Sequence, residues 1–500
     1  MQNETPSGSA SRAALRALTI IGSASVLRIL IGIVRLKIIA ALLGPTGVGL
    51  FGLFTNLQGT VASVAGLGLN FGGVRQMALA KDDPLRLSNA RTALFIGNLL
   101  LGLIAVPAAF FAREWLAELI FQNPGRAWEC GLIGIGVLLA LMAGSQAAVL
   151  QALGFIKPLA WLSVIEITLA TGIGTLILLE WRLGGVIALV LLTPALNFLI
   201  GLVLVARNAA VDVAPRWAAL PGQWRETVSI SLAHMAGTSV ALLTVTFVLA
   251  VTGYYRGTAD VGRLQAVLSI SGLSTSFLIA AMQTDYYPRL VKSAANVAET
   301  NALVNAQARL GLLVSGPLLI GLAGTAEWIL PLLFSAEFAP VATLMGWWLM
   351  SDILLIPARV VGFLMVAHQN SKAYFTTQFL ANLAFALVVS GLLGLEFGLA
   401  SLAIGKIAMT AILLALATGL ARRHHGFRWS GRVVTLAVLF MAIIAALRIL
   451  AVLWPGAAIV PGVLAAVLCG VYSLRCLSRM ADGGIAARLG FLRMGRRTRK

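Results

Sequence analysis

Acidic residues and cysteines are scarce in this chain of 500 residues, and each shortage excludes a class of protein. The sequence has 18 Asp and Glu against 37 Lys and Arg, and charged residues make up only 11% of it. Soluble domains have roughly 25% charged residues, so an ordinary soluble protein is excluded. The cysteines, Cys130, Cys469 and Cys476, form no CxxC pair, which argues against a disulfide framework or a cysteine-based metal site.

Motifs for catalysis and for ATP hydrolysis are also missing. Gly405-Lys406 is followed by Ile407 inside an apolar stretch, so this glycine-lysine pair does not form a phosphate-binding loop. The histidines have no metal-ligand spacing with one another or with cysteine. We therefore expect no catalytic residue, no metal and no cofactor. Any transport must draw its energy from an ion gradient, the membrane potential or the substrate's own gradient.

Apolar residues are abundant instead, at 59% of the chain with a mean hydropathy of +0.94. Stretches of about 20 apolar residues, the length that crosses a bilayer, recur throughout. They predict an all-α polytopic membrane protein with about 14 transmembrane helices. The expected spans lie near 17–43, 49–74, 92–112, 130–151, 159–179, 185–206, 227–252, 262–285, 308–333, 341–367, 373–393, 397–420, 433–453 and 458–474.

Lys and Arg gather in the loops on one side of these spans. Examples are the loop after the second span and the loop after the twelfth, which contain Arg75, Lys81, Arg86, Arg91, Arg422, Arg423, Arg428 and Arg432. The positive-inside rule then puts both termini in the cytoplasm. The basic tail has little aromatic interleaving, so we expect it to meet anionic membrane lipid and not nucleic acid.

A polar stretch with prolines and tryptophans, Arg207–Glu226, predicts a linker between two six-helix halves. A weak internal repeat supports this division, because Gly47-Val48-Gly49 opens the second span and Asp260-Val261-Gly262 opens the eighth. Halves with an even number of spans run parallel, which predicts two lobes around a central cavity. The expected parts are an N-terminal lobe, a linker, a C-terminal lobe, two extra helices and a basic tail, at 1–206, 207–226, 227–422, 433–474 and 475–500.

The first span, Leu18–Ala41, carries Arg28, Arg35 and Lys37. A cation at the centre of a bilayer costs several kcal/mol unless it faces something other than lipid. Arg28 and Arg35 are seven residues apart and so share a helix face. They predict an anion-attracting interior, although both would also suit helix ends or partners of buried acids. Lys37 points away from Arg35 and could reach the headgroups.

Further charges lie within later spans. Asp352 and Arg359 share one face around Pro357. They form a structural ion pair, or Arg359 faces an anion while Asp352 takes part in gating or ion coupling. Glu166 is a cation or proton site, or it pairs with an intramembrane arginine. We expect Lys406 to extend toward the headgroups.

Uncharged polar residues in the second span leave two interpretations open. Asn56 and Gln58 either join helices, at about 0.6 kcal/mol each, or contact sugar hydroxyls. Arg448 in the thirteenth span is expected to be structural or interfacial.

Several short segments resemble a known family. They are Lys37–Ala40, Leu43–Leu50, Ala65–Gly68, Tyr287–Leu290, Trp348–Asp352 and Gly362-Phe363. Together they are similar to the Wzx-type polysaccharide flippases of the multidrug/oligosaccharidyl-lipid/polysaccharide exporter superfamily, in particular to translocases of O-antigen units and of lipid III, the carrier of enterobacterial common antigen. The resemblance covers roughly residues 17–420.

The resemblance implies a monomeric transporter of the bacterial inner membrane. It would flip undecaprenyl-diphosphate-linked oligosaccharide to the periplasmic leaflet by alternating access, with Arg28, Arg35 and Arg359 meeting the diphosphate and glycan. Many such flippases stop at twelve spans. The two extra spans expected here are shared with lipid II flippases, so that substrate stays open. The sequence also leaves open an exporter of small organic cations, a glycan polymerase or ligase, and contacts with polymerases or other assembly proteins.

Overall fold

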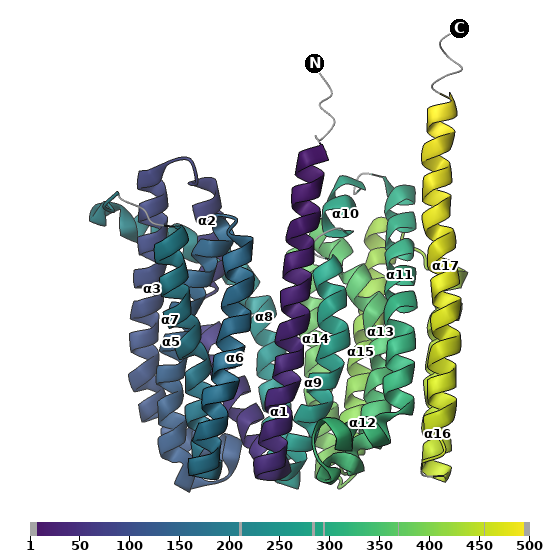
Figure 1. The fold of residues 1–500 in the computed structure, drawn as a ribbon, viewed down its shortest axis with the longest axis horizontal. Coiled ribbons are helices and arrows are strands. Elements are labelled where there is room, and N and C mark those ends of the chain that lie inside the picture. Colours follow the sequence, from purple (N-terminus) through teal and green to yellow (C-terminus); the bar gives the residue numbers. More distant parts are fainter. Residues whose placement is uncertain are drawn as a thin grey trace. The chain divides into compact units, whose positions relative to one another are not determined.

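The computed structural model describes residues 8–209, 213–282, 286–293, 296–368, 370–454 and 456–494 (Figure 1). All the regular secondary structure in these ranges is helical. The contacts divide the chain into two compact units. The first comprises Met1–Ala266 with Leu333–Ser335, and the second comprises Val267–Leu332 with Ala336–Lys500.

The first unit is a bundle of long helices joined by short turns. Its most extensive pairings are α3 with α5, α5 with α7, and α6 with both α1 and α7, and Figure 1 shows α3, α5, α6 and α7 running side by side. The elements are α1 (Gly8–Ala65), α2 (Leu69–Leu79), α3 (Pro84–Phe111), α4 (Arg113–Leu116), η1 (Ala117–Phe121), η2 (Pro124–Arg126), α5 (Ala127–Ala152), α6 (Ile156–Trp181), η3 (Arg182–Gly184), α7 (Gly185–Asn208), η4 (Trp217–Ala219), α8 (Leu220–Arg256) and the start of α9 (Thr258–Ala281).

Helix α1 contains two helical segments joined at a kink. Gly44 has φ 64° and ψ −166°, a conformation that is essentially restricted to glycine. Pro45 follows and cannot donate the backbone hydrogen bond that would continue the helix smoothly. The first expected span therefore lies before the kink. The second expected span begins after the kink and continues past a turn into α2. Leu67 and Gly68 form this turn, and both have positive φ angles.

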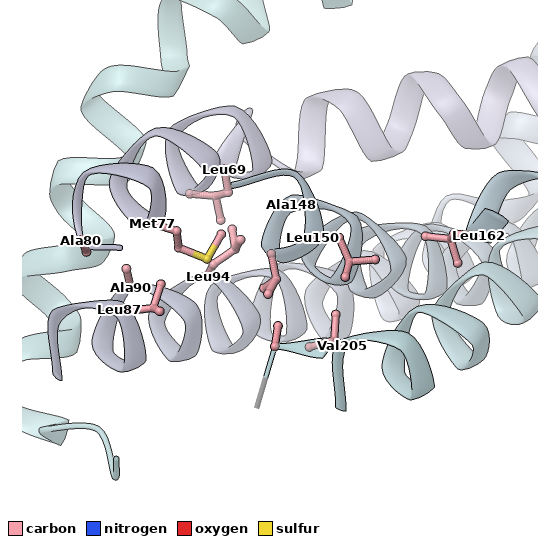
Figure 2. Close-up of a cluster of buried hydrophobic side chains, with 12 residues drawn as sticks. Leu69, Met77, Ala80, Leu87, Ala90, Leu94, Ala148, Leu150, Leu162 and Val205 are labelled. Carbon is pink, nitrogen blue, oxygen red and sulfur yellow. The ribbon is translucent and has the colours of Figure 1, made fainter. Parts of the chain in front are cut away.

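A buried apolar cluster fixes one end of the first unit. It joins α2 and the first turns of α3 to the last turns of α5 and α7 (Figure 2). The start of α3 is well defined because Pro84 occupies the first turn and Asp83 accepts hydrogen bonds from the amides of Leu85 and Arg86. This end of the bundle is therefore held together by apolar packing between helices that are distant in the sequence.

The second unit packs α13 against α15, α14 against α15, and α11 against both α13 and α17. Its last helix, α17, thus lies along α11, as Figure 1 also shows. The elements after α9 are α10 (Tyr287–Ser293), α11 (Val297–Gly324), α12 (Ala326–Leu333), η6 (Ala336–Val341), α13 (Ala342–Ala367), α14 (Ser371–Gly394), α15 (Ala400–His425), α16 (Gly431–Leu453) and α17 (Ile459–Met494).

The helices are apolar on their outer faces as well as inside. Ten stretches of the described residues are long and apolar enough to cross a membrane. Many of their large apolar side chains are exposed, such as Leu100, Ile104, Leu176 and Val438, as expected when lipid and not water is the solvent. The chain is a multi-pass, all-helical membrane protein, as predicted, while the count of fourteen spans stays a prediction.

The grouping by contacts places α8 with the first unit, because α8 packs against α1, α2 and α3. The lobes expected from the internal repeat put the same residues in the second half. Those lobe boundaries stay a prediction. The expected basic tail continues α17 as far as Met494, and its last six residues lie outside the described part of the chain.

Candidate functional site

The first unit contains a polar cluster formed by α1, α6 and α7. Arg35 lies in α1 before the kink and is only half-buried. Its Nη1 donates a hydrogen bond of 3.3 Å to Thr193 Oγ1. Its guanidinium carbon lies 5.1 Å from the centroid of the Phe51 ring, on the segment after the kink, which is within the range of a cation–π contact. The kink thus brings an aromatic ring over the arginine.

Glu166 of α6 is the acid of this cluster. Its side chain is buried and accepts a hydrogen bond of 3.3 Å from the Asn197 amide of α7. Arg28 and Arg35 both attract its carboxylate electrostatically. The predicted shared face of the two arginines therefore turns toward α6, and the structure brings together the three charges that the sequence singled out.

The charges of this cluster do not cancel. Arginine keeps its charge at every accessible pH, so the two guanidinium groups outnumber the single carboxylate. Arg28 is exposed, and Arg35 Nε is buried without a hydrogen-bond partner in the described part of the chain. The cluster thus retains positive charge and a free N–H donor, both of which suit an anionic ligand.

Asn56 and Gln58 lie beyond the kink in α1 and behave differently from each other. Asn56 Nδ2 donates to the carbonyl of Gly52 in its own helix at 2.8 Å. Gln58 is buried and its Nε2 donates to the Gly136 carbonyl of α5 at 3.2 Å, while its Oε1 has no partner in the described residues. Gln58 thus joins two helices. Contact of either residue with a glycan stays a prediction.

The second unit contains its own charged cluster, centred on Asp352 of α13. This carboxylate is 1% exposed and accepts a hydrogen bond of 2.6 Å from Ser271 Oγ of α9. Lys406 Nζ of α15 lies 3.9 Å from its other oxygen. Arg359, further along the same face of α13, attracts the same carboxylate electrostatically. One acid again lies among two cations.

Lys406 does not extend toward the headgroups, contrary to expectation. It is 8% exposed, and its ammonium lies 5.2 Å from the centroid of the Trp348 ring. The difference arises because Asp352, across the helix interface, supplies a counter-charge for the ammonium inside the bundle. Arg359 is half-buried, and its Nε has no hydrogen-bond partner in the described residues.

Arg448 of α16 is structural, one of its two expected roles. It is 1% exposed and its Nη1 donates to the Ala323 carbonyl of α11 at 3.1 Å. Its Nη2 lies 3.5 Å from Thr343 Oγ1 and 3.8 Å from Glu327 Oε1. Arg448 therefore fastens α16 to α11, α12 and α13.

Sequence reasoning missed the uncharged partners of both acids. Thr193 and Asn197 contact Arg35 and Glu166 respectively, and Ser271 contacts Asp352. Thr193 and Asn197 are four residues apart and so share one face of α7. That spacing inside an apolar span was a signal that could have found them.

Comparison with known proteins gives relatives with similar sequences. The lipid III flippase of Escherichia coli (strain K12) is 26% identical over 374 residues, which covers 70% of this chain and 85% of that protein. The lipid III flippase of Shigella flexneri matches with the same identity and coverage.

Solved structures share the fold at low sequence identity. The lipid II flippase MurJ in an inward closed conformation has a TM-score of 0.70 at 12% identity, covering 93% of this chain and 100% of that one. An inward-facing multidrug resistance MATE family transporter of the MOP superfamily has a TM-score of 0.67 at 12% identity, covering 82% of this chain and 95% of that one. At such identities these likenesses concern the fold alone.

A family match covers more than half of the chain. The family described as "Polysaccharide biosynthesis protein" matches residues 14–294, which contain the whole cluster of Arg28, Arg35 and Glu166 and the kink of α1. The match confirms the family resemblance seen in the short segments. This chain belongs to the polysaccharide biosynthesis protein family.

Proposed function

We propose that this protein flips undecaprenyl-diphosphate-linked oligosaccharides from the cytoplasmic to the periplasmic leaflet of the bacterial inner membrane. The observation that carries the proposal is the net positive cluster of Arg28, Arg35 and Glu166 inside an apolar helix bundle. A diphosphate is the anionic part of such a substrate, and guanidinium groups bind phosphate through paired hydrogen bonds. The similarity to lipid III flippases over 70% of the chain supports the same substrate class.

The mechanism we infer is alternating access without chemistry on the substrate. Two lobes that rock about a central site open it to one leaflet at a time. The positive cluster would hold the diphosphate while the glycan crosses, and polar groups such as Gln58 would contact sugar hydroxyls. The second cluster, with Asp352 and Arg359, would meet the glycan or anion and couple the cycle to an ion gradient.

The charge of the first cluster argues against an exporter of small organic cations. Such a protein would need an acidic site, whereas two arginines here face one buried carboxylate. A lipid II flippase would present a similar anion-binding site. The fold likeness to MurJ at 12% identity does not favour that substrate over lipid III or O-antigen units.

Three further features belong to the same proposal. Both termini lie in the cytoplasm, where the basic loops are. The protein works as a monomer, and it contacts membrane lipids throughout. A polysaccharide polymerase or another assembly protein receives the flipped unit on the periplasmic side.

A reconstituted system tests the proposal directly. Purified protein in sealed vesicles is given a fluorescent undecaprenyl-diphosphate oligosaccharide, and a membrane-impermeant quencher reports which leaflet holds the label. We expect wild-type protein to exchange the label between leaflets and Arg35→Ala to lose this activity. Vesicles with wild-type protein that behave like empty vesicles would refute the proposal.

A matched variant separates the role of the cluster from that of general surface charge. Arg86 is an exposed arginine that pairs with Asp83 outside the cluster, at 3.2 Å. Arg86→Ala should flip the lipid as the wild type does. If Arg35→Ala and Arg86→Ala have the same activity, the substrate does not bind at the arginine cluster.

A further inference from the structure

A cavity lies at one end of the first unit, away from the arginine cluster. It has a volume of about 520 Å³ and is bounded by α3, α5, α7 and the linker segment Val213–Pro215. Ligand sites typically measure about 300 to 1,000 Å³, so this cavity can hold part of a lipid-sized molecule.

Unused hydrogen-bonding groups contribute to the lining of this cavity. Gln146 is 4% exposed, yet in the described part of the chain its amide has no hydrogen-bond partner. Arg91 uses a single donor, Nη1, which lies 2.9 Å from the Ala209 carbonyl. A guanidinium has five N–H donors, so most remain for a ligand. Thr92 adds a hydroxyl-bearing side chain to the lining.

Because the Gln146 amide has no partner among the described residues and lines the cavity, its N–H and C=O groups remain available to a ligand there. A cation, an amide and a hydroxyl in the lining of one cavity together match an anion with several acceptor oxygens, such as a phosphate.

The lining of the cavity also contains apolar side chains, namely Phe95, Val149 and Leu202. Leu202 is 46% exposed and continues into the exposed side chains of Leu199 and Val203 on α7, a surface that suits contact with lipid tails. The lining of the cavity is therefore amphipathic, and its apolar part is continuous along α7 with the exposed surface of the unit.

The cavity adjoins the packed end of the unit. Val149, which lines it, also belongs to the buried cluster that ties α3 to the ends of α5 and α7. The linker segment that bounds the cavity is bonded to α3 by two hydrogen bonds. Ser88 Oγ donates to the Val213 carbonyl at 2.6 Å, and the Arg216 amide donates to Asn89 Oδ1 at 2.7 Å.

We propose that this cavity binds an anionic phospholipid of the cytoplasmic leaflet. Its phosphate contacts Arg91, Gln146 and Thr92, and an acyl chain lies along Phe95 and Leu202. The position of the cavity is consistent with the headgroup region of a membrane. Trp217, two residues after the linker segment Val213–Pro215, is 69% exposed, and exposed tryptophans are typical of that region. Anionic lipids are enriched in the cytoplasmic leaflet, which the basic loops assign to this end.

The lipid site is independent of the flipping site. Arg35 contacts Thr193, nine residues before Leu202 on α7, which corresponds to about 14 Å along the helix axis. The proposal holds whatever the protein transports, so its failure and the failure of the proposed function are separate results.

Photocrosslinking tests the site on the full-length protein. Detergent-purified, delipidated protein is irradiated with phosphatidylglycerol that carries a photoreactive group at the top of one acyl chain, and labelled peptides are identified by mass spectrometry. Phosphatidylcholine with the same group is the uncharged comparison. We expect phosphatidylglycerol to label α3, α5 or α7 beside the cavity at least tenfold more than phosphatidylcholine does.

Variants place the lipid within the cavity. Arg91→Gln and Gln146→Leu should each lower labelling at these peptides by about tenfold, and Thr92→Val should lower it less. Arg86→Gln, an exposed arginine on the same helix but outside the cavity, should label as the wild type does, and so should Arg35→Ala. Monodisperse elution with unchanged labelling at lipid-exposed helices elsewhere shows that a variant is folded.

Three results would overturn the proposal. They are equal labelling by the two lipids, wild-type labelling in both Arg91→Gln and Gln146→Leu, and displacement of phosphatidylglycerol by stoichiometric undecaprenyl diphosphate. The last result would assign the cavity to the transported lipid instead of a phospholipid.

Discussion

The two units each bury one carboxylate among two cations, but they hold it differently. In the first unit, Glu166 takes a 3.3 Å hydrogen bond from an amide, and Arg28, one of its cations, is exposed. In the second unit, Asp352 is 1% exposed and Lys406 lies 3.9 Å away. The first cluster is thus open to a ligand, whereas the second is closed around an internal pair. We infer that the arginines of both clusters, Arg35 and Arg359, bind the substrate, and that the closed pair of Asp352 and Lys406 controls the cycle.

The largest effect that separates the clusters should be on stability. Asp352→Ala would leave Lys406 buried without a counter-charge, which costs about 3 to 5 kcal/mol. Glu166→Ala should cost less, because Arg28 is exposed and can be solvated. Thermal unfolding of the purified variants measures both.

The control for that comparison is the double variant Asp352→Ala/Lys406→Met. It removes both charges, so it should recover most of the stability lost in the single variant. A double variant as unstable as Asp352→Ala, or equal losses for Asp352→Ala and Glu166→Ala, would mean that the two clusters are not held differently.

The second prediction concerns substrate affinity. Arg35→Gln and Arg359→Gln should each weaken binding of an undecaprenyl-diphosphate oligosaccharide by at least about tenfold, which is about 1.4 kcal/mol, because both guanidinium groups have an unused Nε donor. Binding to detergent-purified protein gives the dissociation constants, with Arg86→Gln as the unaffected control. A loss confined to Arg35→Gln would restrict the binding site to the first cluster.

The third prediction addresses control of the cycle. Asp352→Asn keeps the size of the side chain and removes its charge, so we expect flipping that no longer responds to an imposed ion gradient while substrate affinity changes less than about threefold. Glu166→Gln should keep the gradient response. Flipping rates of each variant in vesicles, with and without the gradient, measure the gradient response. If Glu166→Gln abolishes the response and Asp352→Asn does not, the roles are reversed.

The membrane fold could be predicted because it depends on local properties of the chain. Apolar length alone indicates where helices cross lipid, and Gly44-Pro45 marks the break in α1. Positions such as Arg28 and Arg35 could also be singled out, because an uncompensated cation inside a span is costly.

The partners of these charges could not be predicted, because they depend on which helices meet. Lys406 was expected at the headgroups since nothing in α15 shows that Asp352 of α13 lies opposite. His368 and His425 likewise end different helices, yet their ring centroids are 3.8 Å apart. A single sequence records which groups need a partner, and only tertiary packing decides which partner each one receives.

The smallest expected effect compares Asn56 and Gln58 within one helix. Asn56 bonds to its own helix at 2.8 Å, so Asn56→Ala should leave stability nearly unchanged. Gln58 bonds across to α5 at 3.2 Å, and interhelical hydrogen bonds in membranes are worth about 0.6 kcal/mol, so Gln58→Leu should lower stability by about that amount. Thermal unfolding tests this difference, and flipping of a glycan-bearing lipid tests function.

If Asn56→Ala slows flipping without changing stability, Asn56 contacts the sugar. If Gln58→Leu changes stability alone, Gln58 only joins α1 to α5, and the glycan must then be recognised elsewhere in the bundle.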